Sequence, residues 1–193
     1  MSHHDESNPW TTLGTRAVYD NPWISVREDQ VIRPDGRPGI YGVVHFKNRA
    51  IGVLPVDERG RIWLVGQYRY TLNAYSWEIP EGGGHAGESN EEAARRELRE
   101  ETGLSAGRLE FLLRAHLSNS VSDEEAFLFR ATDLQDGASQ PEGTERLQVH
   151  RFEWAEVWAM FQRGEITDSM SVMAIQHEAL LRADGGLGSG TRW

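Results

Sequence analysis

The chain has 193 residues, no cysteine, and a formal net charge of −10. This length suits one domain with a real core, and the missing cysteines exclude disulfides, thiolate metal sites and cysteine nucleophiles. The negative charge argues against nucleic acid or an anionic membrane as a partner. The sequence has neither an apolar run long enough to cross a bilayer nor a basic, apolar leader, so we expect a cytoplasmic protein.

The first half of the chain predicts strands separated by turns. Residues 1–11 are polar and are expected to be flexible. Residues 12–46 are expected to form an N-terminal antiparallel β extension, with a glycine-containing turn at 34–39. Two further strand patterns follow at 50–56 and 61–70.

A change of periodicity after the glycines at 82–84, expected to form a loop, predicts a helix over 89–102. Ser89 and Glu92 form a capping-box pattern, and Gly103 is a C-terminal stop. Strand patterns then resume, followed by two closing helices and a flexible tail: 154–164, 169–183 and 184–193. These elements predict an α/β fold in which a mixed sheet lies between helices.

Three glutamates crowd the predicted helix at 89–102. Glu97 and Glu101 are one turn apart and Glu100 lies beside them, so the three carboxylates repel one another. Hard oxygen ligands on one helix face suit Mg²⁺ or Mn²⁺. The alternative is a solvated helix face neutralised by neighbouring arginines, namely Arg95, Arg96 and Arg99.

The spacing of these residues matches a known motif. Its fixed positions are Gly82, Glu88, Arg96, Glu97, Leu98, Glu100, Glu101, Gly103 and Leu104. This is the Nudix box, and over residues 82–104 the chain resembles the Nudix hydrolase family. The resemblance implies an α/β/α sandwich over residues 47–183 and hydrolysis of a nucleoside diphosphate linked to another group.

The resemblance also implies a metal site. Glu97 and Glu101 are expected to be the main ligands of Mg²⁺, or of Mn²⁺, with Glu100 as an additional ligand. The backbone carbonyl of Glu81 is a further candidate. Such an ion neutralises phosphate charge and orients the diphosphate for attack by water.

Arg96 is the remaining charged residue of the box that is expected to serve the reaction. In the resemblance it pairs with Glu88, and the pair holds the glycine loop against the helix.

The residues before the box resemble the branch that hydrolyses ADP-ribose and nucleoside diphosphate sugars. By that resemblance Arg69 contacts the diphosphate, and Glu78 lies near the terminal sugar or the metals. The alternatives are an ion pair at a strand end for Arg69 and a solvated loop carboxylate for Glu78. Tyr68 and Trp23, like Tyr41, are candidates to stack on the base, or else pack in the core or an interface.

The segment 117–129 departs from the branch's pattern. Asn119 and Ser120 replace a Pro-Gly pair, whereas Ser122, Asp123 and Glu124 match. The substrate therefore stays open between ADP-ribose and a wider range of nucleotide sugars. Dinucleoside polyphosphates, and a sensor that binds without hydrolysis, are further alternatives.

Relatives in this branch take a general base from a loop after the box and exchange N-terminal strands across a homodimer. In this chain Glu145 is the first candidate for the base and Glu142 the second. By the same resemblance, residues 12–46 are expected to take part in a homodimer.

Overall fold

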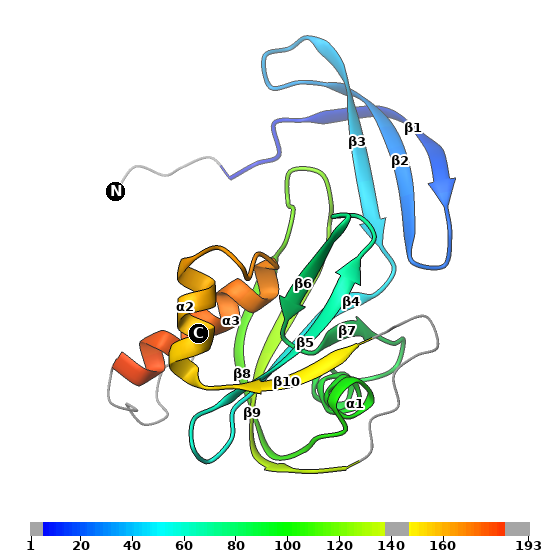
Figure 1. Cartoon of the computed structure of the whole chain (residues 1–193). Helices are drawn as coiled ribbons and strands as arrows, with labels where there is room; N and C mark the ends of the chain where they lie inside the picture. The colour runs from blue at the N-terminus through cyan, green and yellow to red at the C-terminus, as the bar shows by residue number, and fades with distance from the viewer. Residues whose placement is uncertain (1–5, 138–146, 184–193) are drawn as a thin grey trace. The chain divides into compact units, whose positions relative to one another are not determined.

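The computed structural model describes residues 6–137 and 147–183, and the contacts divide the chain into two units. The first unit contains residues up to Asn48 together with His116–Glu124, and the second contains Arg49–Ala115 and the chain from Glu125 onward. Within the described ranges no helix is long and apolar enough to cross a membrane. Figure 1 shows the elements of both units.

The first unit is an antiparallel sheet of three strands in the order β1-β2-β3. The strands are β1 (Thr11–Asp20), β2 (Ile24–Ile32) and β3 (Pro38–Phe46). Gly36, with a φ of 79°, forms the turn between β2 and β3, as the glycine pattern predicted. The segment 116–124 pairs with β3 through Val44, whose N–H lies 2.9 Å from the Val121 carbonyl, and His45 Nδ1 lies 2.5 Å from an Asp123 carboxylate oxygen.

The second unit is built on two sheets, in the orders β10-β5-β6 and β7-β4-β9-β8. The strands are β4 (Arg49–Pro55), β5 (Ile62–Arg69), β6 (Ala74–Glu78), β7 (Glu81–Gly84), β8 (Ser105–His116), β9 (Glu125–Gln135) and β10 (Gln148–Phe152). The helices are α1 (Asn90–Thr102), α2 (Trp154–Gln162) and α3 (Ser169–Ala183). Because β4 pairs parallel with β9 and antiparallel with β7, the sheet is mixed, as expected.

Strand β4 is the centre of this unit. Ile51 and Val53 are fully buried and pack with Leu98 of α1, while α3 packs against β4 and β9. Leu64 on β5 is also fully buried, which agrees with the nearly continuous apolar run of that strand. Burying these aliphatic side chains contributes about 2 kcal/mol each.

Helix α1 begins and ends where its sequence predicts. Ser89 accepts a hydrogen bond from the Glu92 N–H and the Glu92 side chain accepts one from the Ser89 N–H, which completes the capping box. Gly103 adopts a φ of 76°, in the left-handed region that favours glycine. The two closing helices are likewise confirmed.

The glycines before α1 are not a loop, and that expectation was wrong. Gly82 and Gly83 lie in β7, where they pair with Ile51 and Ala50 of β4. Runs of glycine carry no strand signal, because glycine loses the most conformational freedom on ordering. The pairing with β4 fixes these residues beneath α1.

Helix α3 is anchored by a buried carboxylate. Glu178 lies 2.7 Å from Arg130 of β9 and 2.8 Å from Arg182, whose guanidinium also donates to the Gly60 carbonyl. The Arg182 guanidinium lies 4.3 Å from the ring centre of Trp154 on α2. A single network therefore joins α3 to α2, to β9 and to the turn before β5.

Glu178→Ala is expected to lower the free energy of unfolding by about 2 kcal/mol, because two partly buried guanidiniums lose their carboxylate. Urea unfolding followed by circular dichroism measures the change. Glu165→Ala, which removes an exposed ion pair with Arg163, is the control and should change the free energy by less than about 0.5 kcal/mol. Equal losses in the two variants would contradict a special role for Glu178.

Candidate active site

Glu97 and Glu101 project from α1 toward β7 and are only 8% and 3% exposed. Gly82 explains how this is possible, since a Cβ at that position would lie 2.3 Å from the carboxylate carbon of Glu97. Only glycine lets this carboxylate rest on the strand. The Glu81 N–H donates to Glu101 Oε2 at 3.1 Å, so strand and helix are also joined by a hydrogen bond. The burial excludes the alternative of a solvated helix face for these two glutamates.

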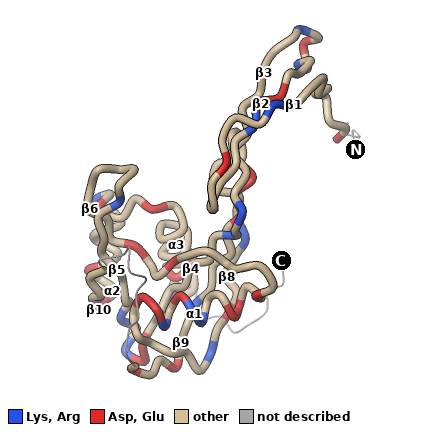
Figure 2. Tube along the Cα trace, turned by 90° about the vertical axis from the view of Figure 1, so that its right-hand side faces the viewer, with Lys and Arg blue, Asp and Glu red and all other residues tan. Residues whose placement is uncertain are grey.

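Arg96 connects the helix with the segment before it. Its Nε and Nη2 donate to the two Glu88 carboxylate oxygens at 2.9 and 3.0 Å, and Nη2 also donates to the Gly83 carbonyl at 2.8 Å. Its Nη1 donates to Glu97 at 2.6 Å and to Glu100 at 2.9 Å. The expected pairing of Arg96 with Glu88 is confirmed, and the guanidinium also stabilises two glutamates of the crowded face. Figure 2 shows acidic and basic residues close together along α1.

Hydrogen bonds from Arg96 lower the pKa of Glu88 from an ordinary 4.5 to about 2. A lowered pKa stabilises the fold above pH 4.5, and this contribution is lost as the pH falls toward 2. We therefore expect Glu88→Gln to lose less unfolding free energy than the wild type between pH 5 and about 3, because the variant lacks this titration. Urea unfolding across that range tests the expectation, and parallel curves for the two proteins would contradict it.

A second group of charges surrounds Arg69 at the end of β5. Its guanidinium lies 2.5 Å from Glu78 and 2.6 Å from Glu81. Glu78 is only 2% exposed, so the alternative of a solvated loop carboxylate is wrong. Arg69 does form an ion pair at a strand end, through its Nε and Nη2.

The Glu81 carboxyl is held in an unfavourable environment for its charge. Burial raises its pKa well above the ordinary value, and the negative charges of Asp168 and Glu78 add to the effect. Its Oε2 atom is buried and finds no hydrogen-bond partner among the described residues. The Glu81 carboxyl is thus buried and incompletely hydrogen-bonded, while the backbone N–H of the same residue donates to Glu101.

The charge balance of the whole cluster favours a cation. Even with Glu81 uncharged, the cluster contains five carboxylates and the two guanidiniums of Arg69 and Arg96. These carboxylates are Glu78, Glu88, Glu97, Glu100 and Glu101. The donors are all hard oxygens, which fit a divalent ion such as Mg²⁺. Within residues 6–137 and 147–183, however, no three acidic or histidine side chains lie close enough together to hold a metal ion as they stand.

The remaining candidates have other surroundings. Tyr68 is exposed and its hydroxyl donates to Asn73 at 2.8 Å, whereas Trp23 is exposed in the first unit. Tyr41 packs edge-on against Trp10 and donates to the Ser120 carbonyl, so it has a packing role. The two candidates for the general base, Glu145 and Glu142, lie outside the described residues.

Sequence patterns did not reveal Ser171 and Asp168, two residues at the start of α3 that lie close to the cluster. Ser171 accepts a hydrogen bond from the Ile79 N–H, and Asp168 accepts one from the Ser171 N–H. The Asp168-Ser169 pair before an apolar helix pattern is a cap signal that would have placed Asp168 at a helix start. No local signal connects Ser171 with Ile79, 92 residues earlier.

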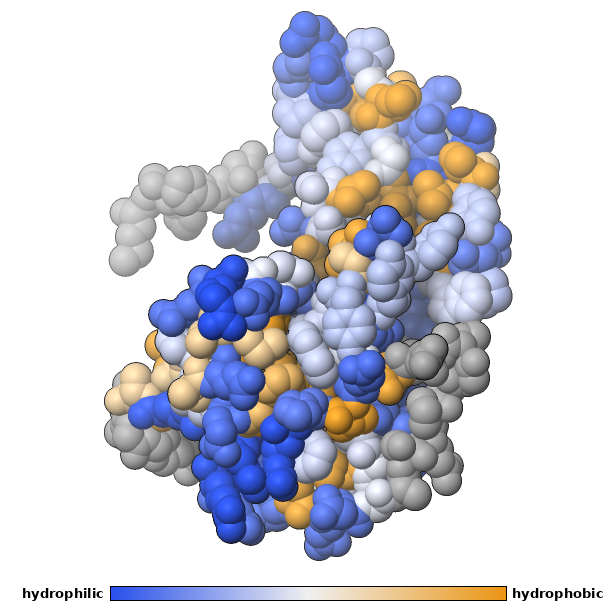
Figure 3. Space-filling view, in the orientation of Figure 1, coloured by the Kyte–Doolittle hydropathy of each residue, from blue (hydrophilic) through white to orange (hydrophobic). Residues whose placement is uncertain are grey.

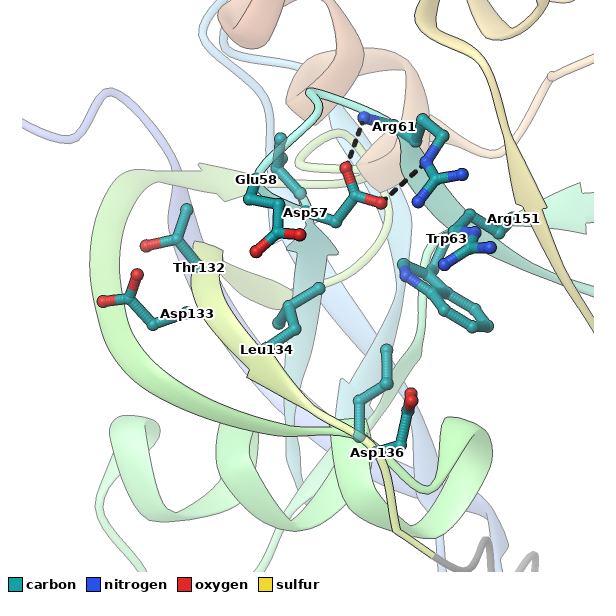
Figure 4. Close-up of a pocket in the computed structure, with 11 residues that line it drawn as sticks. Asp57, Glu58, Arg61, Trp63, Thr132, Asp133, Leu134, Asp136 and Arg151 are labelled. Atoms are coloured by element: carbon teal, nitrogen blue, oxygen red, sulfur yellow. Dashed lines mark hydrogen bonds and ion pairs between the residues drawn. The ribbon is translucent and has the colours of Figure 1, made fainter.

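A separate pocket of about 310 Å³ is lined by residues at or just beyond the ends of β4 and β9 (Figure 4). Its charged groups are partly engaged with one another. Asp57 binds Arg61 at 2.8 Å, and Arg151 lies 5.3 Å from the ring centre of Trp63. The pocket is lined by none of the glutamates of the box. We therefore place the candidate active site at the cluster around Arg96 and Arg69.

Two family models match the chain. One, described as the NUDIX domain, matches residues 46–173. The other, described as the nucleoside diphosphate sugar hydrolase N-terminal domain, matches residues 10–44. Together they cover both units of the structure.

Individual proteins match over most of their length. An ADP-ribose pyrophosphatase of Mycobacterium tuberculosis is 32% identical over 180 residues, which cover 91% of this chain and 84% of the relative. One of Bacillus subtilis is 28% identical over 174 residues, covering 89% and 94%. A solved structure described as an ADP compounds hydrolase matches 95% of this chain and 100% of its own, with a TM-score of 0.84 at 22% identity. This structural likeness confirms the predicted fold.

Proposed function

The chain belongs to the Nudix hydrolase family, and we propose that it hydrolyses the diphosphate bond of ADP-ribose or of a nucleoside diphosphate sugar. The products are a nucleoside monophosphate and a sugar phosphate. The observation that carries the proposal is that the box is intact and that Arg96 binds its glutamates into one largely buried cluster. The match of residues 10–44 to a nucleoside diphosphate sugar hydrolase domain and the two ADP-ribose pyrophosphatase relatives support this substrate class.

Members of this family generally depend on a divalent metal ion, and we propose Mg²⁺, with Mn²⁺ as a substitute. Glu97 and Glu101 would hold it, helped by Glu100 and the Glu81 carbonyl. When bound, the ion supplies charge neutralisation at the diphosphate and activation of water. Arg96 holds Glu97 and Glu100 in place before the ion and substrate arrive.

Arg69 is proposed to contact the diphosphate. Glu78 and Glu81 bind its Nε and Nη2, which orients the guanidinium and leaves the Nη1 group able to donate to a phosphate oxygen. In this proposal Glu78 lies near the terminal sugar of the substrate or near the metal ions. Tyr68 and Trp23 offer exposed aromatic faces for a base.

Glu145 is proposed as the general base, with Glu142 as the alternative. A base must come within hydrogen-bond reach of the attacking water. Glu145→Gln and Glu142→Gln, compared at saturating substrate, distinguish the two. The base is the residue whose loss lowers kcat by about a hundredfold or more.

A homodimer is proposed through the sheet of the first unit. Leu13, Tyr19, Trp23 and Ile40 are large, exposed apolar side chains of this unit, and Figure 3 shows hydrophobic residues at its surface. Such a surface is typical of a protein interface. Light scattering should give twice the chain mass of 21.8 kDa, and a monomer at micromolar concentration would contradict this part. A cytoplasmic location, where nucleotide sugars are used, belongs to the same proposal.

A substrate panel with Mg²⁺ tests the function. ADP-ribose, ADP-glucose, GDP-mannose, UDP-glucose, a diadenosine polyphosphate and NADH are each incubated with the protein, and the products are separated by chromatography. Preferential cleavage of ADP-ribose or a nucleotide sugar supports the proposal. Cleavage of the dinucleotides alone would assign a different Nudix substrate, and no turnover even with Mn²⁺ would favour a sensor.

A further inference from the structure

The two groups of charges in the active site meet at a tight corner of the chain. We call residues 78–81 the β6–β7 corner, because Glu78 ends β6 and Glu81 begins β7. Both side chains bind Arg69. The position of this corner therefore sets the position of the Arg69 side chain. It also sets the position of the Glu81 N–H, which donates to Glu101.

Three different elements hold the backbone of the β6–β7 corner. The Pro80 carbonyl accepts a hydrogen bond from the Val53 N–H of β4 at 2.9 Å. The Glu81 N–H donates to Glu101 of α1 at 3.1 Å. The third contact comes from α3, where Ser171 Oγ accepts the Ile79 N–H at 2.9 Å.

The contact from α3 is made by a fully buried hydroxyl. Ser171 is itself held by Asp168, whose carboxylate accepts the Ser171 N–H at 2.7 Å and whose carbonyl accepts the Val172 N–H at 2.9 Å. The first turn of α3 is thus capped, and it presents one side-chain acceptor to the corner. Because the Ser171 hydroxyl is closed off from solvent, water cannot take its place without a rearrangement of the surrounding residues.

We propose that Ser171 is a positioning residue of the active site, through which α3 fixes the β6–β7 corner and so aligns Arg69 and Glu101. The inference rests on the proposed function and assigns no chemistry to Ser171 itself. If the hydroxyl is lost, the buried Ile79 N–H has to find another partner, which moves the corner. A shift of this kind misaligns both charged groups while leaving every charged residue present.

The test compares Ser171→Ala with Ile175→Val in the full-length protein. Ile175 is also fully buried on α3, and the loss of one methylene there lowers stability but removes none of the three hydrogen bonds to the corner. Each variant is assayed for kcat and KM with the best substrate of the panel, for Mn²⁺ affinity by electron paramagnetic resonance, and for melting temperature.

We expect Ser171→Ala to lower kcat about tenfold and to raise KM severalfold, because a metal-binding glutamate and the guanidinium proposed to bind the diphosphate are both displaced. Its Mn²⁺ dissociation constant should rise about tenfold, since the hydrogen bond from the Glu81 N–H orients Glu101, a proposed metal ligand. Ile175→Val should keep kcat and Mn²⁺ affinity within about twofold of wild type. Wild-type values in Ser171→Ala, or equal losses in the two variants, would overturn the proposal.

The Mn²⁺ measurement also separates this inference from the proposed function. If the wild type cleaves no substrate of the panel, the proposed function fails, and Mn²⁺ affinity alone decides the role of Ser171. A tenfold weaker affinity confined to Ser171→Ala would then support the positioning role, and unchanged affinity would exclude it.

Discussion

Glu97→Gln should lower kcat about a thousandfold, which corresponds to roughly 4 kcal/mol of lost transition-state stabilisation. The substitution keeps the size of the side chain and its place over Gly82, but removes the charge that would hold the metal ion. Stability should change little, because the amide oxygen can still accept the hydrogen bond from Arg96 while the crowded face loses one repelling carboxylate. Initial rates at saturating Mg²⁺ and substrate, with a thermal melt of the same samples, measure both effects.

The matched control is Glu91→Gln, which removes the same charge from an exposed position in the first turn of α1. Its kcat should stay within about twofold of wild type, because surface substitutions are usually neutral. The proposed role of Glu97 would be contradicted if Glu97→Gln kept more than a tenth of the wild-type rate.

Arg96→Ala should lower the free energy of unfolding by about 3 kcal/mol and reduce the rate at the same time. The guanidinium makes five hydrogen bonds, to Glu88, Glu97, Glu100 and the Gly83 carbonyl. Its removal leaves three partly buried carboxylates without their shared cation and frees the segment before α1. Urea unfolding and initial rates measure the two losses.

Arg99→Ala is the control for charge and helix position, since Arg99 is exposed in the last turn of the same helix. Its loss should cost less than about 1 kcal/mol. If both arginine variants lost the same stability, the network around Arg96 would contribute no more than an ordinary surface charge. If Arg96→Ala kept full activity, the guanidinium would be dispensable for ordering Glu97.

Local signals explain why α1 was predictable from sequence. Ser89, Glu92 and Gly103 act within a few residues of one another, and each lies in the structure where its physical role requires. The pairing of Glu88 with Arg96 was predictable for a different reason, namely the resemblance of residues 82–104 to the Nudix box.

Long-range contacts explain what the sequence did not show. Strand β7 is a glycine-containing segment that becomes a strand because β4 supplies its hydrogen bonds. Glu78 resembles a loop carboxylate in sequence, yet Arg69 lets it be buried. Ser171 meets Ile79 across 92 residues, and no propensity or spacing rule encodes such a contact.

The most direct test of the account follows AMP and ribose 5-phosphate released from ADP-ribose by the wild type and by Glu97→Gln, in parallel. We predict equal amounts of the two products from the wild type with Mg²⁺, none after chelation with EDTA, and about a thousandfold less from the variant. Wild-type turnover that survives EDTA, or equal rates for the two proteins, would contradict a metal-dependent hydrolytic site at these glutamates.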